Sequence, residues 1–220
     1  MVLAIGWLFN LIQDGGAMMY ALIICSLVGL FYIIERAIAY ARIKGDTGEI
    51  FSAVREDLLG GDLRQAVEVC ESYDHPVSTT LKSGLLRYGK SSEEIEKAME
   101  SVALHEVSKL ERGLWVLLTV ANIAPLFGFL GTVIGMILAF DALSEQGLGN
   151  PQAVGQGISQ ALITTATGLA IALPVQTAYN YFNSRVSNFA LDMETSTSML
   201  LETFSEIEES PTKVAAAGRQ

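Results

Sequence analysis

Three long stretches without internal charge constrain this chain more than any other feature of its sequence: Ala17–Ile34, Leu114–Phe140 and Ile158–Arg185, the last of which ends at its first charged residue. Each has about 18 residues or more, enough for a helix to cross a hydrocarbon layer of ~30 Å. Since backbone polar groups in lipid must be satisfied within their own segment, the stretches are predicted to be transmembrane helices. Buried core helices of a soluble protein are the alternative, and three such runs in 220 residues argue against it.

The composition agrees with a membrane protein whose charges are confined to particular segments. The chain is 50% hydrophobic with a mean hydropathy of +0.38, too apolar for an ordinary soluble domain of net charge −10. An acidic chain also lacks the basic surface that a nucleic-acid partner needs. Cys25 lies in the first predicted span and Cys70 in a polar segment, so no disulfide framework is expected.

The lysine and arginine residues indicate how the chain is oriented in the membrane. Of these 14 residues, eleven lie between Arg36 and Arg112, and three lie from Arg185 onward. The segment before the first span and the loop after the second span contain none. Because basic residues favour the cytoplasmic side, the N-terminus is predicted to lie outside and the C-terminus in the cytoplasm.

The polar segment between the first two spans is predicted to be helical. Its expected helices are Glu49–Leu59, stopped by Gly60-Gly61; a helix capped by Asp62 that runs through Tyr73; Val77–Tyr88; and a helix capped by Ser91, with Glu94 completing a capping box. Nothing from Ser91 to Gly113 breaks the helical pattern, so the last helix is expected to continue into the second span as a stalk.

The third span is expected to continue as one helix from Ile158 to Glu209, ~78 Å long at ~1.5 Å per residue. Its cytoplasmic part carries an apolar stripe with steps of three and four residues, and we expect the stalk and other copies of the chain to cover that stripe. The stripe consists of Phe182, Val186, Phe189, Met193, Leu200, Phe204 and Ile207.

Small residues line one face of each of the last two spans, at steps of four, three and four: Gly128, Thr132, Gly135 and Ala139 in the second, and Ala161, Thr165, Gly168 and Ala172 in the third. Small residues let helices approach closely in lipid, so these stripes are typical of helix-packing faces. A hydroxyl in each stripe also suits a narrow path lined by polar groups. The residues alone leave both interpretations open.

Two long motifs in these spans resemble the MotA/TolQ/ExbB proton-channel family, and its ExbB and TolQ branch most of all. They are Pro125-Leu-Phe-Gly-Phe-Leu-Gly-Thr-Val-Ile-Gly-Met136, and Gly157-Ile-Ser-Gln-Ala-Leu-Ile-Thr-Thr-Ala-Thr-Gly-Leu-Ala-Ile-Ala-Leu-Pro174 followed by Tyr179-Asn180. The resemblance extends from the helix that begins at Asp62-Leu63 through Phe182. Three spans with the N-terminus outside also match that branch.

The resemblance implies an all-α membrane protein that forms a pentamer in the bacterial inner membrane, around single-span partners of the ExbD or TolR type. A transmembrane aspartate of each partner would carry protons, with sodium not excluded, and a TonB-like or TolA-like protein would receive the motion. The ion pathway would contain Thr132, Thr165, Gln160 and Thr164. The residues that pack helices or line the pore would be Pro125, Gly128, Gly131, Gly135, Ala139, Ala161, Gly168, Ala172 and Pro174.

Gln160 departs from the family pattern, because many ExbB and TolQ sequences have glutamate there. Neither the second nor the third span contains a carboxylate, lysine or histidine. The titrating group must therefore come from a partner, while the threonine hydroxyls can only solvate and position it.

These features together divide the chain into eight segments. They are a periplasmic interfacial helix over 1–16, a first transmembrane helix over 17–39, a cytoplasmic helical domain and stalk over 40–112, a second transmembrane helix over 113–143, a periplasmic loop over 144–157, a third transmembrane helix over 158–183, a cytoplasmic helix over 184–209 and a disordered tail over 210–220.

No enzymatic activity is predicted, because no nucleophile–base pair, phosphate loop or metal cluster stands out. His75 and His105 have no carboxylate or cysteine pattern beside them, so neither a metal nor a cofactor is expected. The predicted function is an energy-transducing channel subunit that works with a partner. The alternative is a membrane scaffold or a solute transporter subunit, in which the small-residue faces only pack helices.

Overall fold

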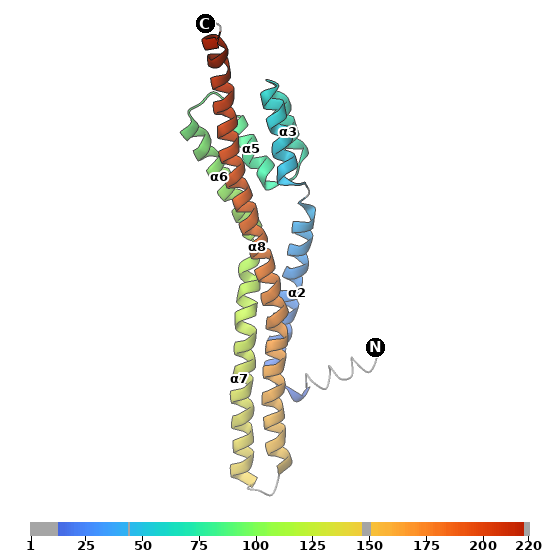
Figure 1. Ribbon diagram of the computed structural model, residues 1–220. Coiled ribbons are helices and arrows are strands. Elements are labelled where there is room, and N and C mark those ends of the chain that lie inside the picture. The colour runs from blue at the N-terminus through green and yellow to red at the C-terminus, as the bar shows by residue number, and fades with distance from the viewer. Residues whose placement is uncertain (1–12, 44, 147–150, 218–220) are drawn as a thin grey trace. The chain divides into compact units, whose positions relative to one another are not determined.

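The computed structural model describes residues 13–43, 45–146 and 151–217, which contain helices and no strand (Figure 1). The helices are α2 (Met18–Arg42), α3 (Thr47–Leu59), α4 (Leu63–Ser72), α5 (Pro76–Leu85), α6 (Ser92–Glu111), α7 (Leu114–Gln146) and α8 (Pro151–Ala217). The predicted interfacial helix falls almost wholly outside the described residues.

Three of the helices are long and apolar enough to cross a membrane: α2, α7 and the first part of α8. Their apolar windows coincide with the three stretches that lack charge. A turn precedes the first span, since Gly16 adopts a φ of +66° just before α2 begins. Three candidate spans in an all-helical chain make this a multi-pass membrane protein.

The chain forms two units. The first, which we call the membrane unit, contains the described residues through Arg36 together with Gly113–Phe182, and the second, the polar unit, contains Ala37–Arg112 and the described residues from Asn183 onward. Helices α2 and α8 each contribute to both units.

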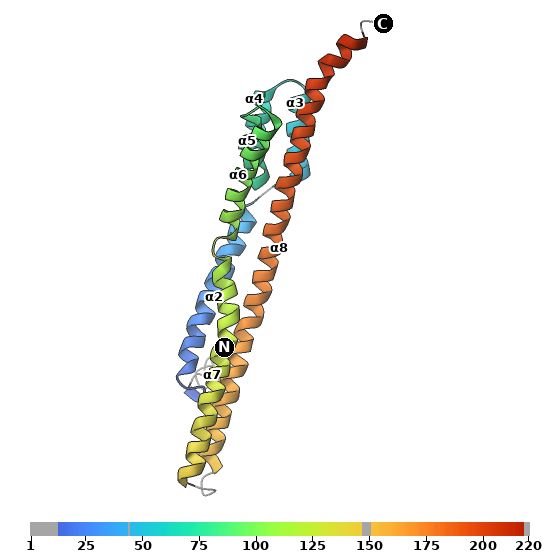
Figure 2. The ribbon, with the colours of Figure 1, turned by 90° about the vertical axis from the view of Figure 1, so that its left-hand side faces the viewer.

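In the membrane unit, α7 lies side by side with the first part of α8 (Figures 1 and 2). Helix α2 packs on this pair through Met19 and Leu22, which form a small buried cluster with Ala124 and Ala172. Gly29 provides a second point of close approach, because a Cβ atom placed there would lie 2.9 Å from Val175.

In the polar unit, helices α3 to α6 form a core with the second part of α8. Met193, Leu200 and Phe204 of α8 are buried in that core beside Leu81 of α5 and Met99 of α6. This chain itself thus covers these three residues of the apolar stripe, which was expected to be covered by the stalk and by other copies of the chain.

Side-chain caps fix the ends of several helices in the polar unit. Asp62 accepts a hydrogen bond from the backbone N–H of Gln65, and Ser91 accepts one from that of Glu94, as predicted.

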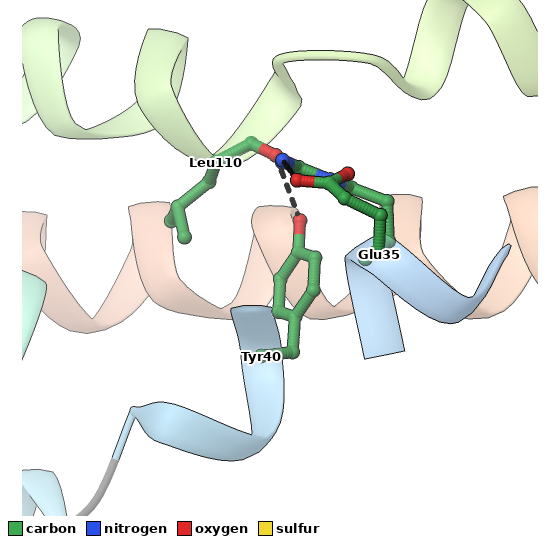
Figure 3. Close-up of polar contacts among 4 residues, drawn as sticks. Glu35, Tyr40 and Leu110 are labelled. Carbon is green, nitrogen blue, oxygen red and sulfur yellow. Dashed lines mark hydrogen bonds and ion pairs between the residues drawn. The ribbon is translucent and has the colours of Figure 1, made fainter. Parts of the chain in front are cut away.

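The Tyr40 hydroxyl donates a hydrogen bond to the backbone carbonyl of Leu110 at 3.0 Å, which ties the end of α2 to the end of α6 (Figure 3).

The predicted continuous helix from the stalk into the second span is wrong. Helix α6 ends at Glu111, Arg112 leaves the helical conformation with a ψ of 122°, and Gly113 adopts a φ of +85° before α7 begins. This left-handed conformation favours glycine, which has no Cβ to clash. Gly113 therefore separates α6 from α7.

Four limits of three helices also differ from the predictions. Helix α7 continues to Gln146 and α8 begins at Pro151, so much of the expected loop over 144–157 is helical. Proline is well suited to the first turn of a helix, because it lacks the N–H that would be unpaired there. Helix α8 continues through Pro211 to Ala217 rather than ending at Glu209, since the alanines that follow favour helix. Helix α5 ends at Leu85, three residues before the predicted end at Tyr88.

Candidate functional site

The candidate site is the contact between α7 and the first part of α8, where both small-residue stripes meet. The two helices run antiparallel, so early residues of α7 pair with late residues of the stripe on α8. Ala124 meets Gly168, and Ala139 at the other end meets Gly157. The structure thus brings the predicted stripes together within one copy of the chain.

Glycines let the two backbones touch along this contact. A Cβ atom on Gly168 would lie 2.7 Å from the carbonyl oxygen of Ala124, and one on Gly135 would lie 2.7 Å from that of Gly157. Neither distance is possible for a real side chain, and a backbone neighbour cannot move away as a flexible side chain can. Ala139 and Ala161 are also buried in the contact, with 3% and 1% of their surfaces exposed.

Thr132 and Thr165 meet at the centre of the contact, and both hydroxyls lie at the backbone carbonyl of Gly128. Thr132 Oγ1 donates to that carbonyl within α7 at 3.2 Å, and Thr165 Oγ1 donates to it across the helices at 3.1 Å. The two hydroxyl oxygens also contact each other. Because a hydroxyl can both donate and accept, either threonine can exchange its hydrogen-bond partner without gaining a charge.

Thr164 has a different position from its neighbour Thr165. Its side chain is fully buried against Gly131, where no Cβ atom could fit. Its hydroxyl donates back to the carbonyls of its own helix, at Gln160 and Ala161. The geometry gives Thr164 a packing position, and its place in an ion pathway stays a prediction.

Gln160 lies half-buried near the start of α8, with its side-chain amide against Gly16 in the turn that precedes α2. A Cβ atom on Gly16 would collide with that amide nitrogen. Gln160 therefore contacts the entrance to the first span rather than the Thr132–Thr165 pair.

The remaining predicted residues spread over different surroundings. Pro125 lies inside α7 without ending it and is half-buried. Ala172 is buried in the cluster that Met19 and Leu22 of α2 form with Ala124 of α7, and Pro174 is exposed on α8.

Sequence reasoning missed two members of the contact, Ala124 and Gly157. Each lies four residues before a stripe residue that was identified, Gly128 and Ala161 respectively. Extending each stripe by one helical turn toward its N-terminal end would have found both.

The site contains no charged group of its own. The charge-free stretches of α7 and α8 offer hydroxyls, amides and backbone carbonyls. Across the part of the chain that the structure describes, no group of three or more His, Cys, Asp or Glu residues could hold a metal ion.

The sequence matches the MotA/TolQ/ExbB proton channel family over residues 72–195, more than half of the chain. It is 32% identical over 184 residues to a putative biopolymer transport protein, an ExbB homolog of Methanothermobacter thermautotrophicus, covering 83% of this chain and 65% of that one. It is 34% identical over 163 residues to a putative ExbB-like biopolymer transport protein of Synechocystis, covering 72% of this chain and 64% of that one.

A further relative is the Tol-Pal system protein TolQ of Haemophilus influenzae, 41% identical over 96 residues, which are 44% of this chain and 42% of that one. The chain thus spans slightly less than two thirds of the first two relatives. The family match includes the whole contact between α7 and α8, with both threonines.

Proposed function

Because this chain belongs to the MotA/TolQ/ExbB proton channel family, in its ExbB and TolQ branch, we propose that it is the channel subunit of an inner-membrane motor. The motor couples the proton motive force, together with a partner of the ExbD or TolR type, to work in the periplasm or at the outer membrane. Family membership supports a transport role rather than an enzymatic one.

The arrangement of Thr132 and Thr165 carries this proposal. A charged carboxylate at the centre of a bilayer costs at least ~2.5–3.5 kcal/mol, so a partner aspartate needs polar groups opposite it. The two hydroxyls can turn toward an ionised carboxylate as donors, and the Gly128 carbonyl can accept from its protonated form, at one point of an otherwise apolar helix pair. They are held there before any partner arrives, which lowers the cost of solvating the aspartate.

The proton itself is proposed to travel on that partner aspartate, because the charge-free stretches of α7 and α8 hold no carboxylate, lysine or histidine.

We propose a homopentamer around the partner helices. Large apolar side chains exposed on the polar unit support an assembly of copies, since no lipid covers them there. They include Leu104 of α6, 64% exposed, and Leu191 of α8, 61% exposed.

The proposed topology places the N-terminus and the α7–α8 connection in the periplasm, and the polar unit in the cytoplasm. The split of basic residues supports this orientation, as both segments that hold them would lie in the cytoplasm. A TonB-like or TolA-like protein would carry the motion across the periplasm.

A scaffold or a solute transporter subunit is the second candidate function. The glycine contacts at Gly135 and Gly168 favour it, because they show the small residues packing α7 against α8 within one chain. In that case the threonines would only complete the packing.

Purification from the native membrane separates the two functions. For a channel subunit we expect a small protein with one membrane helix and a transmembrane aspartate to co-purify, and native mass spectrometry to give five copies of this chain. A stable monomer without such a partner would contradict the channel proposal. The double variant Thr132→Val and Thr165→Val should assemble with the partner as the wild type does.

A further inference from the structure

His75 caps the first turn of α5 in an unusual way. Its ring nitrogen Nδ1 accepts a hydrogen bond from the backbone N–H of Val77 at 3.2 Å. A ring nitrogen that accepts must be unprotonated, so the cap exists only while the imidazole is neutral, with its proton on Nε2. Protonation at Nδ1 would bring two N–H donors, that of the ring and that of Val77, face to face and break the hydrogen bond.

The same ring also contacts α8. His75 is only 4% exposed, and its ring meets that of Phe189 edge to face at a centroid distance of 5.5 Å. The Arg185 guanidinium lies 5.4 Å from the centre of the Phe189 ring. The cap therefore joins the start of α5 to α8 in the polar unit.

Charged groups of both signs surround the imidazole. Asp192 of α8, which accepts a hydrogen bond from Thr47, and Asp46 before α3 both favour a positive ring. Arg185 beyond Phe189 and the partial positive charge of the α5 N-terminus oppose it. Burial lowers the pKa of His75 below its ordinary value of 6.5 despite the two aspartates.

We propose that His75 is a pH-sensitive latch, whose protonation releases the first turn of α5 from its cap and draws the ring toward Asp192 and Asp46. The Ser78 hydroxyl in the same turn is buried and has no hydrogen-bond partner among the described residues, so the turn leaves one polar group unpaired even with the cap in place. In the orientation proposed above, this latch would lie on the side where protons leave the pathway.

The pH dependence has a definite sign. The unfolded or opened segment binds a proton near the ordinary pKa of 6.5, whereas the closed segment binds it only at lower pH. The closed form is therefore fully favoured above that pKa and loses stability as the pH falls below it. Each unit by which the pKa is lowered increases opening at low pH by about tenfold.

Hydrogen–deuterium exchange of the full-length protein in detergent tests the latch, with rates corrected for the effect of pH on chemical exchange. Between about pH 7.5 and about pH 5, the amides of residues 77–80 should lose protection in the wild type. The variant His75→Asn should show no such pH dependence, since asparagine caps helices without titrating. His105→Asn removes the exposed second histidine on α6 and should behave as the wild type.

Unchanged protection of residues 77–80 in the wild type would overturn the proposal, as would an equal loss in His75→Asn. If His75→Asn does not fold, the imidazole resonances of the wild type decide, because the chain has 2 histidines. The His75 resonance should titrate below the ordinary histidine pKa, together with a shift of the α5 amides. Titration of His75 near the ordinary pKa, with no amide shift, would overturn the latch.

Discussion

Thr132 and Thr165 reach the Gly128 carbonyl from opposite helices, and this convergence depends on the absence of side chains around it. Gly128 and Gly168 bring the two backbones together, so the Thr165 hydroxyl can cross to α7. Thr164, one residue earlier, points to Gly131 and bonds within its own helix. Neighbouring threonines thus differ in what their hydroxyls can offer to a partner.

Cys70 gives a prediction at the same scale. Burial raises the pKa of its thiol to about 12; nearby Glu71 raises it slightly, and Lys82 opposes the rise. At pH 8 the reactive thiolate should be about one ten-thousandth of the total. We expect Cys70 to resist maleimide in the folded protein and to react after denaturation, as measured by mass spectrometry. Rapid labelling under native conditions would show that the polar core opens.

At the scale of single helices, the fit between α7 and α8 can be tested with two glycines of one helix. Gly168→Ala places a methyl group against the Ala124 carbonyl, whereas Gly155→Ala enters open space. We expect Gly168→Ala to cost roughly 1–3 kcal/mol, as overpacking does. A lower midpoint of thermal unfolding in detergent would report this loss.

Gly155→Ala should leave that midpoint unchanged or raise it slightly, because alanine favours helix over glycine by roughly 0.5–1 kcal/mol. Equal effects of the two substitutions would contradict the close contact between α7 and α8.

The sequence predicts the helices well where periodicity and caps agree, as at Asp62 and Ser91. It does not reveal the break at Gly113, because a single glycine inside a helix costs only ~1 kcal/mol. That cost is too small to predict that a helix ends there. The φ of +85° at Gly113 depends on what the two helices pack against. For the candidate site, the steps of three and four residues in the stripes predict which face of each helix carries the small residues. They do not say that the two faces meet within one chain, which depends on the helix pairing.

At the scale of the whole molecule, the orientation can be tested with exposed positions. Cysteines at Ser144 and Gln152 should react with an impermeant reagent added to intact cells, whereas cysteines at Ser101 and Ser198 should not. All four side chains are exposed in the structure, so accessibility depends on the membrane rather than on burial. A cysteine at Ser83 of the polar unit would not serve this test, since Ser83 is only 8% exposed and burial alone would protect it from the reagent. Labelling at Ser101 in intact cells would show that the topology is the reverse of the proposed one.

Proton flux through the purified complex tests the central claim most directly. This chain and its co-purified partner would be placed in vesicles with an internal pH dye, and flux would be driven by a potassium diffusion potential. A potential of about 100 mV supplies ~2.3 kcal/mol per charge, similar to the cost of one poorly solvated charge. We predict flux for the wild type and for Thr167→Val, whose hydroxyl donates to the carbonyl of Ile163 within α8, and its loss for the double variant Thr132→Val and Thr165→Val. Wild-type flux through an intact double-variant complex would contradict the account.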